Sequence, residues 1–315
     1  MVKNLTNKKD LKSFVDNCKK EGKKIALVPT MGALHGGHIA LIDLAKEFAD
    51  EVLVSIFINP LQFNNLQDFE RYPITLQKDL EKITSHGKAT AVFSPNINDI
   101  YPEKIAINFN SELFDRLCGK DRLGHFAGVC AIVVKLFNLT GANFAVFGEK
   151  DFQQLQIIRQ LVKDFNFPIE IISLPTHRES SSRESGSRES SKGYQGLAMS
   201  SRNQRLSRDS LIKATALYRQ MQFFASSFAN YYLQYQHNNI AYLELIEIIS
   251  DLTNVAKANI IDAGFDKIDY FTLMDEETLT DFTSQNFLAK IHRKKRIFVA
   301  ATIDEVRLID NLAII

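Results

Sequence analysis

The stretch that decides the fold is Val28-Pro29-Thr30-Met31-Gly32-Ala33-Leu34-His35-Gly36-Gly37-His38. It follows a short apolar run at residues 24–28 and leads into an amphipathic segment at residues 39–50, so the pattern predicts a strand, a glycine-rich turn and a helix. The first turn of a helix presents unpaired N–H groups and a partial positive charge, and it therefore attracts phosphate. Glycines let the backbone approach a ligand, and two imidazoles can donate hydrogen bonds to a phosphate whose charge is changing. The stretch indicates chemistry on a nucleotide.

A His-x-x-His pair can also be a coincidence, a surface pair or half of a metal site. Zinc is the less favoured interpretation, because no nearby Cys, Asp or Glu completes a ligand set. The spacing also differs from the i,i+4 histidine pair of a zinc-protease helix. The strand before the turn and the helix after it favour phosphate.

The composition is that of an ordinary globular protein of 315 residues, long enough for one large domain or two. A formal net charge of +1 gives no basic field for nucleic acid. Cys18, Cys118 and Cys130 are an odd number without close spacing, which fits a reducing compartment better than a disulfide framework. The N-terminus lacks the apolar core of a signal peptide, and no apolar run reaches the length of a membrane span. We therefore expect a cytoplasmic protein without nucleic-acid or membrane partners.

The first half of the chain alternates short apolar runs with helical patterns, which predicts βαβ units and a twisted parallel sheet. The predicted strands lie at residues 25–28, 52–58, 89–93, 144–147 and 169–174. The second half carries helical patterns at residues 208–228 and 240–262 and strand patterns at residues 267–274, 296–302 and 307–312. These indicate a smaller α+β domain. We place the boundary so that residues 1–176 form the parallel-sheet domain and residues 177–315 the second one.

A low-complexity segment follows the predicted boundary. Residues 180–193 are almost all Ser, Arg, Glu and Gly, and Arg-Glu-Ser recurs at residues 178–180, 183–185 and 188–190. Such a segment cannot bury apolar area, so we expect it to be mobile. Its arginines could serve a lid that meets phosphates, but a slipped-repeat expansion in a tolerant surface loop is the favoured interpretation.

Ligands of parallel sheets bind beyond the carboxyl ends of the strands, and polar residues follow several predicted strands there. After the strand at residues 144–147 comes Gly148-Glu149-Lys150-Asp151. Lys150 can reach a phosphate as a point charge, and Asp151 can cap a helix that begins at Phe152. Taken alone, such a pair is more often solvated surface.

Amide side chains can bind hydroxyl and carboxylate groups without adding charge. Asn59 and Gln62 follow the second predicted strand, in a loop that reaches Tyr72, and an ordinary polar loop would look the same. Gln153 and Gln154 lie on the first turn of the helix after Asp151, and one of them should face the strand ends. An exposed glutamine is an equally good interpretation from spacing alone.

Two further clusters suggest anion contacts. Arg122 is a candidate anion ligand at the start of a long helix, where His125 could cap the helix or meet a partner across an interface. Met199-Ser200-Ser201-Arg202 supplies two hydroxyls and a guanidinium, which can bind a triphosphate. By itself Ser-Ser-Arg carries almost no information.

Together the motifs resemble the pantoate–β-alanine ligase (pantothenate synthetase) family of HIGH-type nucleotidyltransferases. The matching segments span nearly the whole chain in order, and each is modest although the ordered set is specific. They are Pro29-Thr30-Met31-Gly32-Ala33-Leu34-His35-x-Gly37-His38, Asn59-Pro60-x-Gln62-Phe63, Tyr72-Pro73, Arg122-x-Gly124-His125-Phe126-x-Gly128-Val129, Phe147-Gly148-x-Lys150-Asp151-x-Gln153-Gln154-Leu155, Gly196-Leu197-Ala198-Met199-Ser200-Ser201-Arg202-Asn203 and Leu308-Ile309-Asp310-Asn311.

The resemblance implies a Rossmann-like α/β domain with a smaller α+β C-terminal domain, and a homodimer. It implies that ATP, accompanied by Mg²⁺, reacts with (R)-pantoate to give pantoyl adenylate and pyrophosphate, and that β-alanine then releases pantothenate and AMP.

Site residues also follow from the resemblance. It implies that ATP is bound by Met31, Gly32, Ala33, Leu34, His35, Gly36, Gly37, His38, Gly148, Glu149, Lys150, Asp151, His177, Met199, Ser200, Ser201 and Arg202. His38 would be the proton donor, and His35, Lys150 and Arg202 would hold phosphate. Pantoate and β-alanine would be bound by Gln62, Gln154, Asn59, Tyr72 and Arg122. Asp79 is a magnesium candidate.

The chain departs from the family pattern at two places near the boundary. Sixteen residues, 180–195, separate Arg178-Glu179 from the Gly-Leu-Ala-Met run, where the family has a couple. His177 stands where an aliphatic residue usually meets adenine through its backbone. Two rivals therefore stay open: another nucleotidyltransferase of the same fold, and a nucleotide-binding regulatory protein that the insertion has inactivated.

Overall fold

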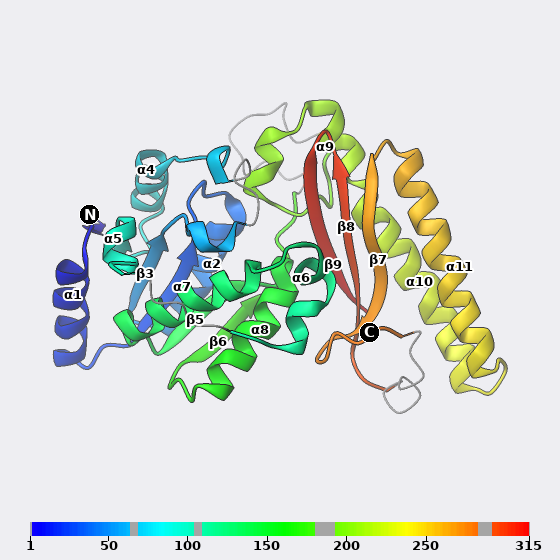
Figure 1. Ribbon diagram of the computed structural model, residues 1–315, viewed down its shortest axis with the longest axis horizontal. Coiled ribbons are helices and arrows are strands. Elements are labelled where there is room, and N and C mark those ends of the chain that lie inside the picture. The colour runs from blue at the N-terminus through cyan, green and yellow to red at the C-terminus, as the bar shows by residue number, and fades with distance from the viewer. Residues whose placement is uncertain (1, 64–68, 104–108, 180–192, 283–291, 315) are drawn as a thin grey trace. The chain divides into compact units, whose positions relative to one another are not determined.

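The computed structural model describes residues 2–63, 69–103, 109–179, 193–282 and 292–314. The chain forms two compact units, Met1–His177 and Arg178–Ile315 (Figure 1). Most of the low-complexity segment, at residues 180–192, lies outside the described residues, so our expectation about its mobility stays a prediction. No helix in the described part of the chain is long and apolar enough to cross a membrane.

The first unit contains a six-stranded parallel sheet, in the order β1-β4-β3-β2-β5-β6. Its strands are β1 (Lys3–Leu5), β2 (Ile25–Thr30), β3 (Glu51–Ile56), β4 (Ala91–Phe93), β5 (Phe144–Gly148) and β6 (Glu170–Leu174). The central strands are nearly continuous apolar runs because they are buried on both faces, as parallel strands with helices on both sides must be. The predicted parallel sheet is confirmed, and the edge strand β1 is an addition to it.

Helices connect these strands. They are α1 (Lys8–Lys20), α2 (Gly36–Phe48), α4 (Leu76–His86), α5 (Ile97–Ile100), α6 (Leu117–Asp121), α7 (His125–Thr140) and α8 (Phe152–Asp164), with 3₁₀ turns η1 (Pro60–Gln62), η2 (Glu112–Asp115) and η3 (Glu149–Asp151). Leu41, Ile42 and Ala45 of α2 pack in one core cluster with Val28 of β2 and Val54 of β3. This packing fixes α2, and with it the turn that begins it, against the middle of the sheet.

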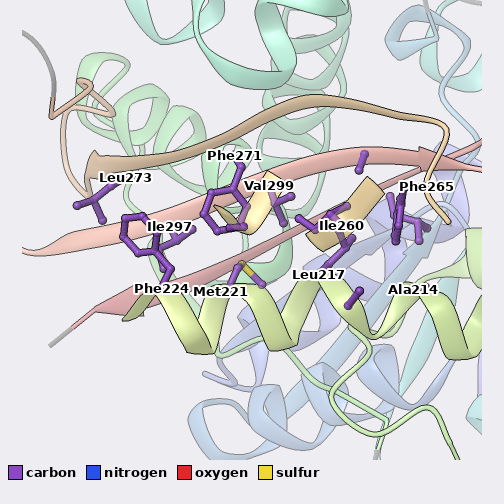
Figure 2. Close-up of a cluster of buried hydrophobic side chains, with 14 of the residues drawn as sticks. Ala214, Leu217, Met221, Phe224, Ile260, Phe265, Phe271, Leu273, Ile297 and Val299 are labelled. Atoms are coloured by element: carbon purple, nitrogen blue, oxygen red, sulfur yellow. The ribbon is translucent and has the colours of Figure 1, made fainter. Parts of the chain in front are cut away.

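The second unit is the predicted α+β domain. An antiparallel sheet of β7 (Lys267–Asp275), β8 (Lys295–Ile303) and β9 (Val306–Ile314) accompanies α9 (Arg208–Ala214), α10 (Ala216–Gln236), α11 (Tyr242–Asp262) and the 3₁₀ turn η4 (Ser201–Arg205). Figure 2 shows its core, in which Met221 and Phe224 of α10 face Phe271, Ile297 and Val299 of the sheet. The core residues are large and fully buried, which gives this unit an apolar interior of its own.

Candidate active site

The topological switch point of the sheet lies between β2 and β5. The chain runs from β2 to its neighbour β3 on one side, whereas β5 joins the other side of β2 only after β4 has been added. Ligands of open parallel sheets bind at the carboxyl ends of the strands at such a point. Two of the predicted segments begin there: residues 31–38 follow β2, and Gly148 to Asp151 follow β5.

The turn after β2 has an unusual backbone. Gly32 and Ala33 both have positive φ, at 83° and 50°. A Cβ on Gly32 would lie 3.1 Å from Oδ2 of Asp79 and 3.3 Å from Cγ2 of Ile56, so a side chain has neither the conformation nor the space it needs. Below the turn, Asp79 of α4 is 2% exposed and accepts hydrogen bonds from the turn. The turn is therefore held closely by its neighbours.

The two histidines cap the helix that they begin. Nδ1 of His35 accepts a hydrogen bond from the N–H of Gly37, and Nδ1 of His38 accepts one from the N–H of His35, each at 3.2 Å. The ring centroids are 4.1 Å apart. Because both Nδ1 atoms accept, each neutral ring carries its proton on Nε2. We expected unpaired N–H groups in the first turn of this helix, but the N–H of Gly37 donates to His35. The Nε2–H groups of the two histidines are further donors at this turn.

Both rings are held neutral. Burial lowers the pKa of His35 to about 2, and the nearby charges of His38, Lys150 and Lys82 act in the same direction. Burial also lowers the pKa of His38 to about 4, although Asp79 and Asp151 oppose the shift. Two Nε2–H donors beside an ammonium group form a site that can bind an anion through hydrogen bonds and charge.

The loop after β5 supplies that ammonium group. Lys150 Nζ lies 3.7 Å from Oδ1 of Asp151, and its charge is close enough to lower the pKa of both histidines. The helix α8 begins at Phe152 as predicted, but the prediction that the Asp151 side chain caps it is wrong, because the side chain makes no capping hydrogen bond. The 3₁₀ turn η3 leads directly into this helix. Glu149 is turned to β6, where its Oε1 accepts a hydrogen bond from Ser173.

The amide loop after β3 is fixed by close packing. Asn59 is 1% exposed and donates to Oε1 of Gln62 at 3.2 Å and to the carbonyl of Gly128 at 2.9 Å. A Cβ on Gly128 would lie only 2.2 Å from the carbonyl oxygen of Leu61, so the helix α7 can approach this loop only because it has glycine there. Nε2 of Gln62 donates to the sulfur of Met31, which joins the amide loop to the turn after β2.

The candidate residues at the start of α7, Arg122 and His125, are also connected to Gln62 by hydrogen bonds. Nδ1 of His125 donates to the carbonyl of Gln62 at 2.6 Å, and Arg122 donates to Nε2 of the same ring at 3.1 Å. The suggestion that His125 caps α7 is wrong, because Gly124 is the cap residue and the ring is turned to Gln62. Tyr72 is buried with its ring edge against Phe63, at a centroid distance of 5.6 Å. Arg122 and Tyr72 therefore lie near the amide loop.

The two glutamines of α8 differ. Gln153 is buried, accepts from the N–H of Cys118 and donates to the carbonyls of Leu113 and Arg116, so it holds the segment around α6. Gln154 is only partly buried. Of the pair, Gln154 is the one that can turn to a substrate.

The remaining candidates lie at the end of the first unit and in the second. His177 ends the first unit, and its Cβ is 3.6 Å from where a Cβ on Gly37 would be. In the second unit, Met199 follows the bridge between Arg178 and Ala198, and Ser200 begins the 3₁₀ turn η4 by accepting from the N–H of Arg202. Ser201 is the first residue of that turn.

No described residues form a group of three or more His, Cys, Asp or Glu side chains that could hold a metal ion. Asp79, the magnesium candidate, has both oxygens engaged: Oδ1 with the N–H of Leu34, and Oδ2 with the N–H of Ala33 and the hydroxyl of Thr75. This carboxylate does not fit a magnesium ligand, since its nearest partners are hydrogen-bond donors.

The fold and this site define a nucleotide-binding enzyme of the Rossmann-like α/β class, with paired histidines in the first turn of the helix after β2. Comparison with known proteins makes the class specific. Residues 3–313 match the family model of pantoate-beta-alanine ligase. The chain belongs to this family.

Individual relatives agree. A pantothenate synthetase of Ruegeria sp. (strain TM1040) is 39% identical over 306 residues, which cover 97% of this chain and 96% of the relative. The crystal structure of pantothenate synthetase from Thermus thermophilus matches with a TM-score of 0.80 and 30% identity over 99% of both chains. A pantoate-beta-alanine ligase from Francisella tularensis, complexed with beta-gamma ATP and beta-alanine, has a TM-score of 0.73 and 34% identity over 99% of this chain and 98% of that one.

Proposed function

We propose that this chain condenses (R)-pantoate with β-alanine by way of a pantoyl adenylate. In the first step a carboxylate oxygen of pantoate attacks the α-phosphorus of ATP, and the bond to the β-phosphate breaks to release pyrophosphate. In the second step the amine of β-alanine attacks the acyl carbon, AMP leaves, and the amine loses a proton. The observation that carries this proposal is the pair of neutral Nε2–H imidazoles beside Lys150 at the switch point of the sheet.

Phosphoryl transfer of this kind depends on positioning and charge stabilisation more than on covalent chemistry. In the proposal, the turn from Met31 to His38 and the loop from Gly148 to Asp151 bind the nucleotide. The Nε2–H groups of His35 and His38 and the ammonium of Lys150 stabilise the charge that develops on the phosphates. The family's proton donor stands at the position of His38, and in this proposal the neutral ring supplies that proton as a hydrogen bond from Nε2–H to the phosphates.

Pantoate lies between two amides in this proposal. Gln62 binds it and borders the β-alanine site, and Gln154 binds it from α8. Because Asn59 is buried and donates to Oε1 of Gln62, its role is to orient that amide. Tyr72 and Arg122 complete the surroundings of the amide loop. An acyl adenylate hydrolyses readily, so the proposal requires the site to exclude water until the amine arrives.

Further parts of the proposal follow from the family. His177 meets adenine through its backbone, and Met199, Ser200, Ser201 and Arg202 bind the β- and γ-phosphates. Mg²⁺ enters as the counter-ion of ATP. The protein is a homodimer and is cytoplasmic.

Mass spectrometry of the products tests the proposed function. Purified protein is incubated with ATP, pantoate and β-alanine, and with each reactant omitted in turn. We expect pantothenate and AMP in equal amounts only from the complete mixture, and pyrophosphate exchange into ATP whenever pantoate is present. A nucleotide retained on the product would instead indicate a nucleotidyltransferase. ATP binding in calorimetry without any product would indicate a regulatory protein.

A further inference from the structure

We propose that Asp79 is a positioning residue that holds the turn after β2 in its phosphate-binding conformation, and that it acts through the backbone rather than through a metal ion. The inference rests on the proposed role of residues 31–38 as the nucleotide loop. Asp79 lies in the first turn of α4, a helix that begins more than forty residues after the turn. The contacts between the two segments carry the argument.

The carboxylate takes up two consecutive peptide N–H groups of the turn. Oδ1 accepts from Leu34 at 2.8 Å, and Oδ2 accepts from Ala33 at 2.9 Å. Hydrogen bonds from N–H groups to an ionised carboxylate are about twice as strong as those between neutral partners. Two of them at adjacent residues fix the orientation of both peptide planes.

The same face of α4 adds two more contacts. The hydroxyl of Thr75 donates to Oδ2 of Asp79 at 2.9 Å and accepts from the N–H of Ala33 at 3.1 Å. Nζ of Lys82 donates to the carbonyl of Leu34. Residues 75, 79 and 82 are spaced by four and three, so they share one face of the helix. That face of α4 therefore contacts the backbone of the turn after β2.

The turn needs this support because its backbone is strained. Ala33 has a φ of 50°, in the left-handed region that costs a residue with a Cβ roughly 1–2 kcal/mol. The fit is also tight, since a Cβ on Gly32 would meet Oδ2 of Asp79 at 3.1 Å. Without the carboxylate, only the Thr75 hydroxyl and Nζ of Lys82 would still hold the turn, so we expect the left-handed Ala33 and the adjoining His35 to be held less firmly.

The two roles considered for Asp79 differ in their chemistry. A magnesium ligand needs oxygen lone pairs that face the metal, whereas these oxygens face three donors, two of them on the backbone. A positioning residue affects the turn even when neither metal nor nucleotide is bound. The roles can therefore be separated in the ligand-free protein.

The test uses Asp79→Asn, with Glu81→Gln as the control, because Glu81 is an exposed carboxylate on the same helix. In magnesium-free, nucleotide-free protein we expect the amide protons of Ala33 and Leu34 to move upfield and to exchange at least about tenfold faster in Asp79→Asn. They should be unchanged in Glu81→Gln. This measurement does not depend on the reaction, so it stands even if the proposed function fails.

Kinetics give the second measurement. At saturating pantoate we expect Asp79→Asn to raise the KM for ATP at least about tenfold. The free Mg²⁺ concentration for half-maximal rate at saturating ATP should stay within about twofold of that of the unaltered protein. Thr75→Val removes a hydroxyl contact and no charge, and it should raise the KM for ATP in the same direction by a smaller factor. This variant keeps the test available if Asp79→Asn does not fold.

Three outcomes would overturn the proposal. A rise of tenfold or more in the Mg²⁺ requirement with unchanged amide signals would make Asp79 a metal ligand. Unchanged amide signals and an unchanged KM for ATP would remove it from the site. Loss of unfolding free energy with an unchanged KM for ATP would leave it a purely structural residue.

Discussion

Arg178 donates two hydrogen bonds to the carboxylate of Asp310, at 2.6 and 2.9 Å, so the first residue of the second unit is fixed to its last strand. The same guanidinium donates to the carbonyls of Gly196 and Asn311 and stacks on Tyr218, 3.9 Å from the ring centroid. Both partners of the ion pair are mostly buried. The segment on either side of the insertion is therefore held by one charged contact.

Arg178→Met should lower the unfolding free energy of the second unit by about 3 kcal/mol, because it leaves the carboxylate of Asp310 buried without its cation. The measurement is urea unfolding followed by the near-ultraviolet signal of the tyrosines. Lys213→Met is the matched control, since it breaks an exposed pair with Asp209, which should contribute much less than the buried pair because water screens it. Equal losses in the two variants would show that burial of the pair is unimportant.

Removal of residues 181–192 should leave kcat and each KM within about twofold of the original values. The chain enters and leaves the insertion at paired backbone positions, where the N–H of Glu179 donates to Leu197 and the N–H of Gly196 donates to Glu179. Tyr194 is kept because it packs against the core of the second unit. Steady-state kinetics check this. A tenfold fall in kcat would instead make the insertion a working lid.

Two substitutions of His38 separate the role of its Nε2–H donor from that of its Nδ1 atom, which caps the helix. His38→Asn keeps an acceptor for the N–H of His35 but loses Nε2–H, whereas His38→Ala loses both. We expect pantoate-dependent pyrophosphate exchange to fall about 100-fold or more in both variants, because a donor to the phosphates is gone. Only His38→Ala should lose stability, by about 1 kcal/mol, with the cap. Normal exchange in His38→Asn would remove the imidazole donor from the reaction.

Gly128→Ala should impair pantoate use more than ATP use. The added Cβ would lie 2.2 Å from the carbonyl oxygen of Leu61, so the loop that carries Gln62 must move. We expect the KM for pantoate to rise at least about tenfold, as in Gln62→Ala, with a much smaller change in the KM for ATP. Ala131→Gly, on the same helix, controls for general weakening of α7. Equal changes in both KM values would argue against the assignment of Gln62 to pantoate.

Stability should fall as the pH drops below 6.5. The folded protein lowers the pKa of His38 to about 4 and that of His35 to about 2, both by burial. Between 6.5 and those values the unfolded chain binds protons that the folded chain does not, so each ring weakens folding by up to about 1.4 kcal/mol per pH unit. Urea unfolding at pH 7 and pH 5 measures this. The double variant His35→Asn/His38→Asn should lose less stability between pH 7 and pH 5 than the unaltered protein. An equal loss would show that the lowered pKa values of these two rings do not cause the pH dependence.

Periodicity predicted the fold well wherever strands are buried on both faces. The strand β1 and the helix α1 went unpredicted because β1 has three residues and α1 carries its four buried residues among many lysines. Local spacing did not reveal that Asp79 serves Ala33 and Leu34, since those contacts join residues more than forty apart. The close approach of α7 to the amide loop at Gly128 could have been inferred from the sequence, because a glycine inside a helical pattern often marks a close packing contact.

The hydrogen bonds that close the neck between Glu179 and Gly196 also bear on how this chain acquired its extra length. Because Glu179 is paired with Gly196 and Leu197, we expect a change in the number of Arg-Glu-Ser repeats between them to leave these paired positions in place. Doubling a flexible loop costs roughly 0.6 kcal/mol of closure entropy. We therefore expect length changes at this point to cost the folded protein little free energy.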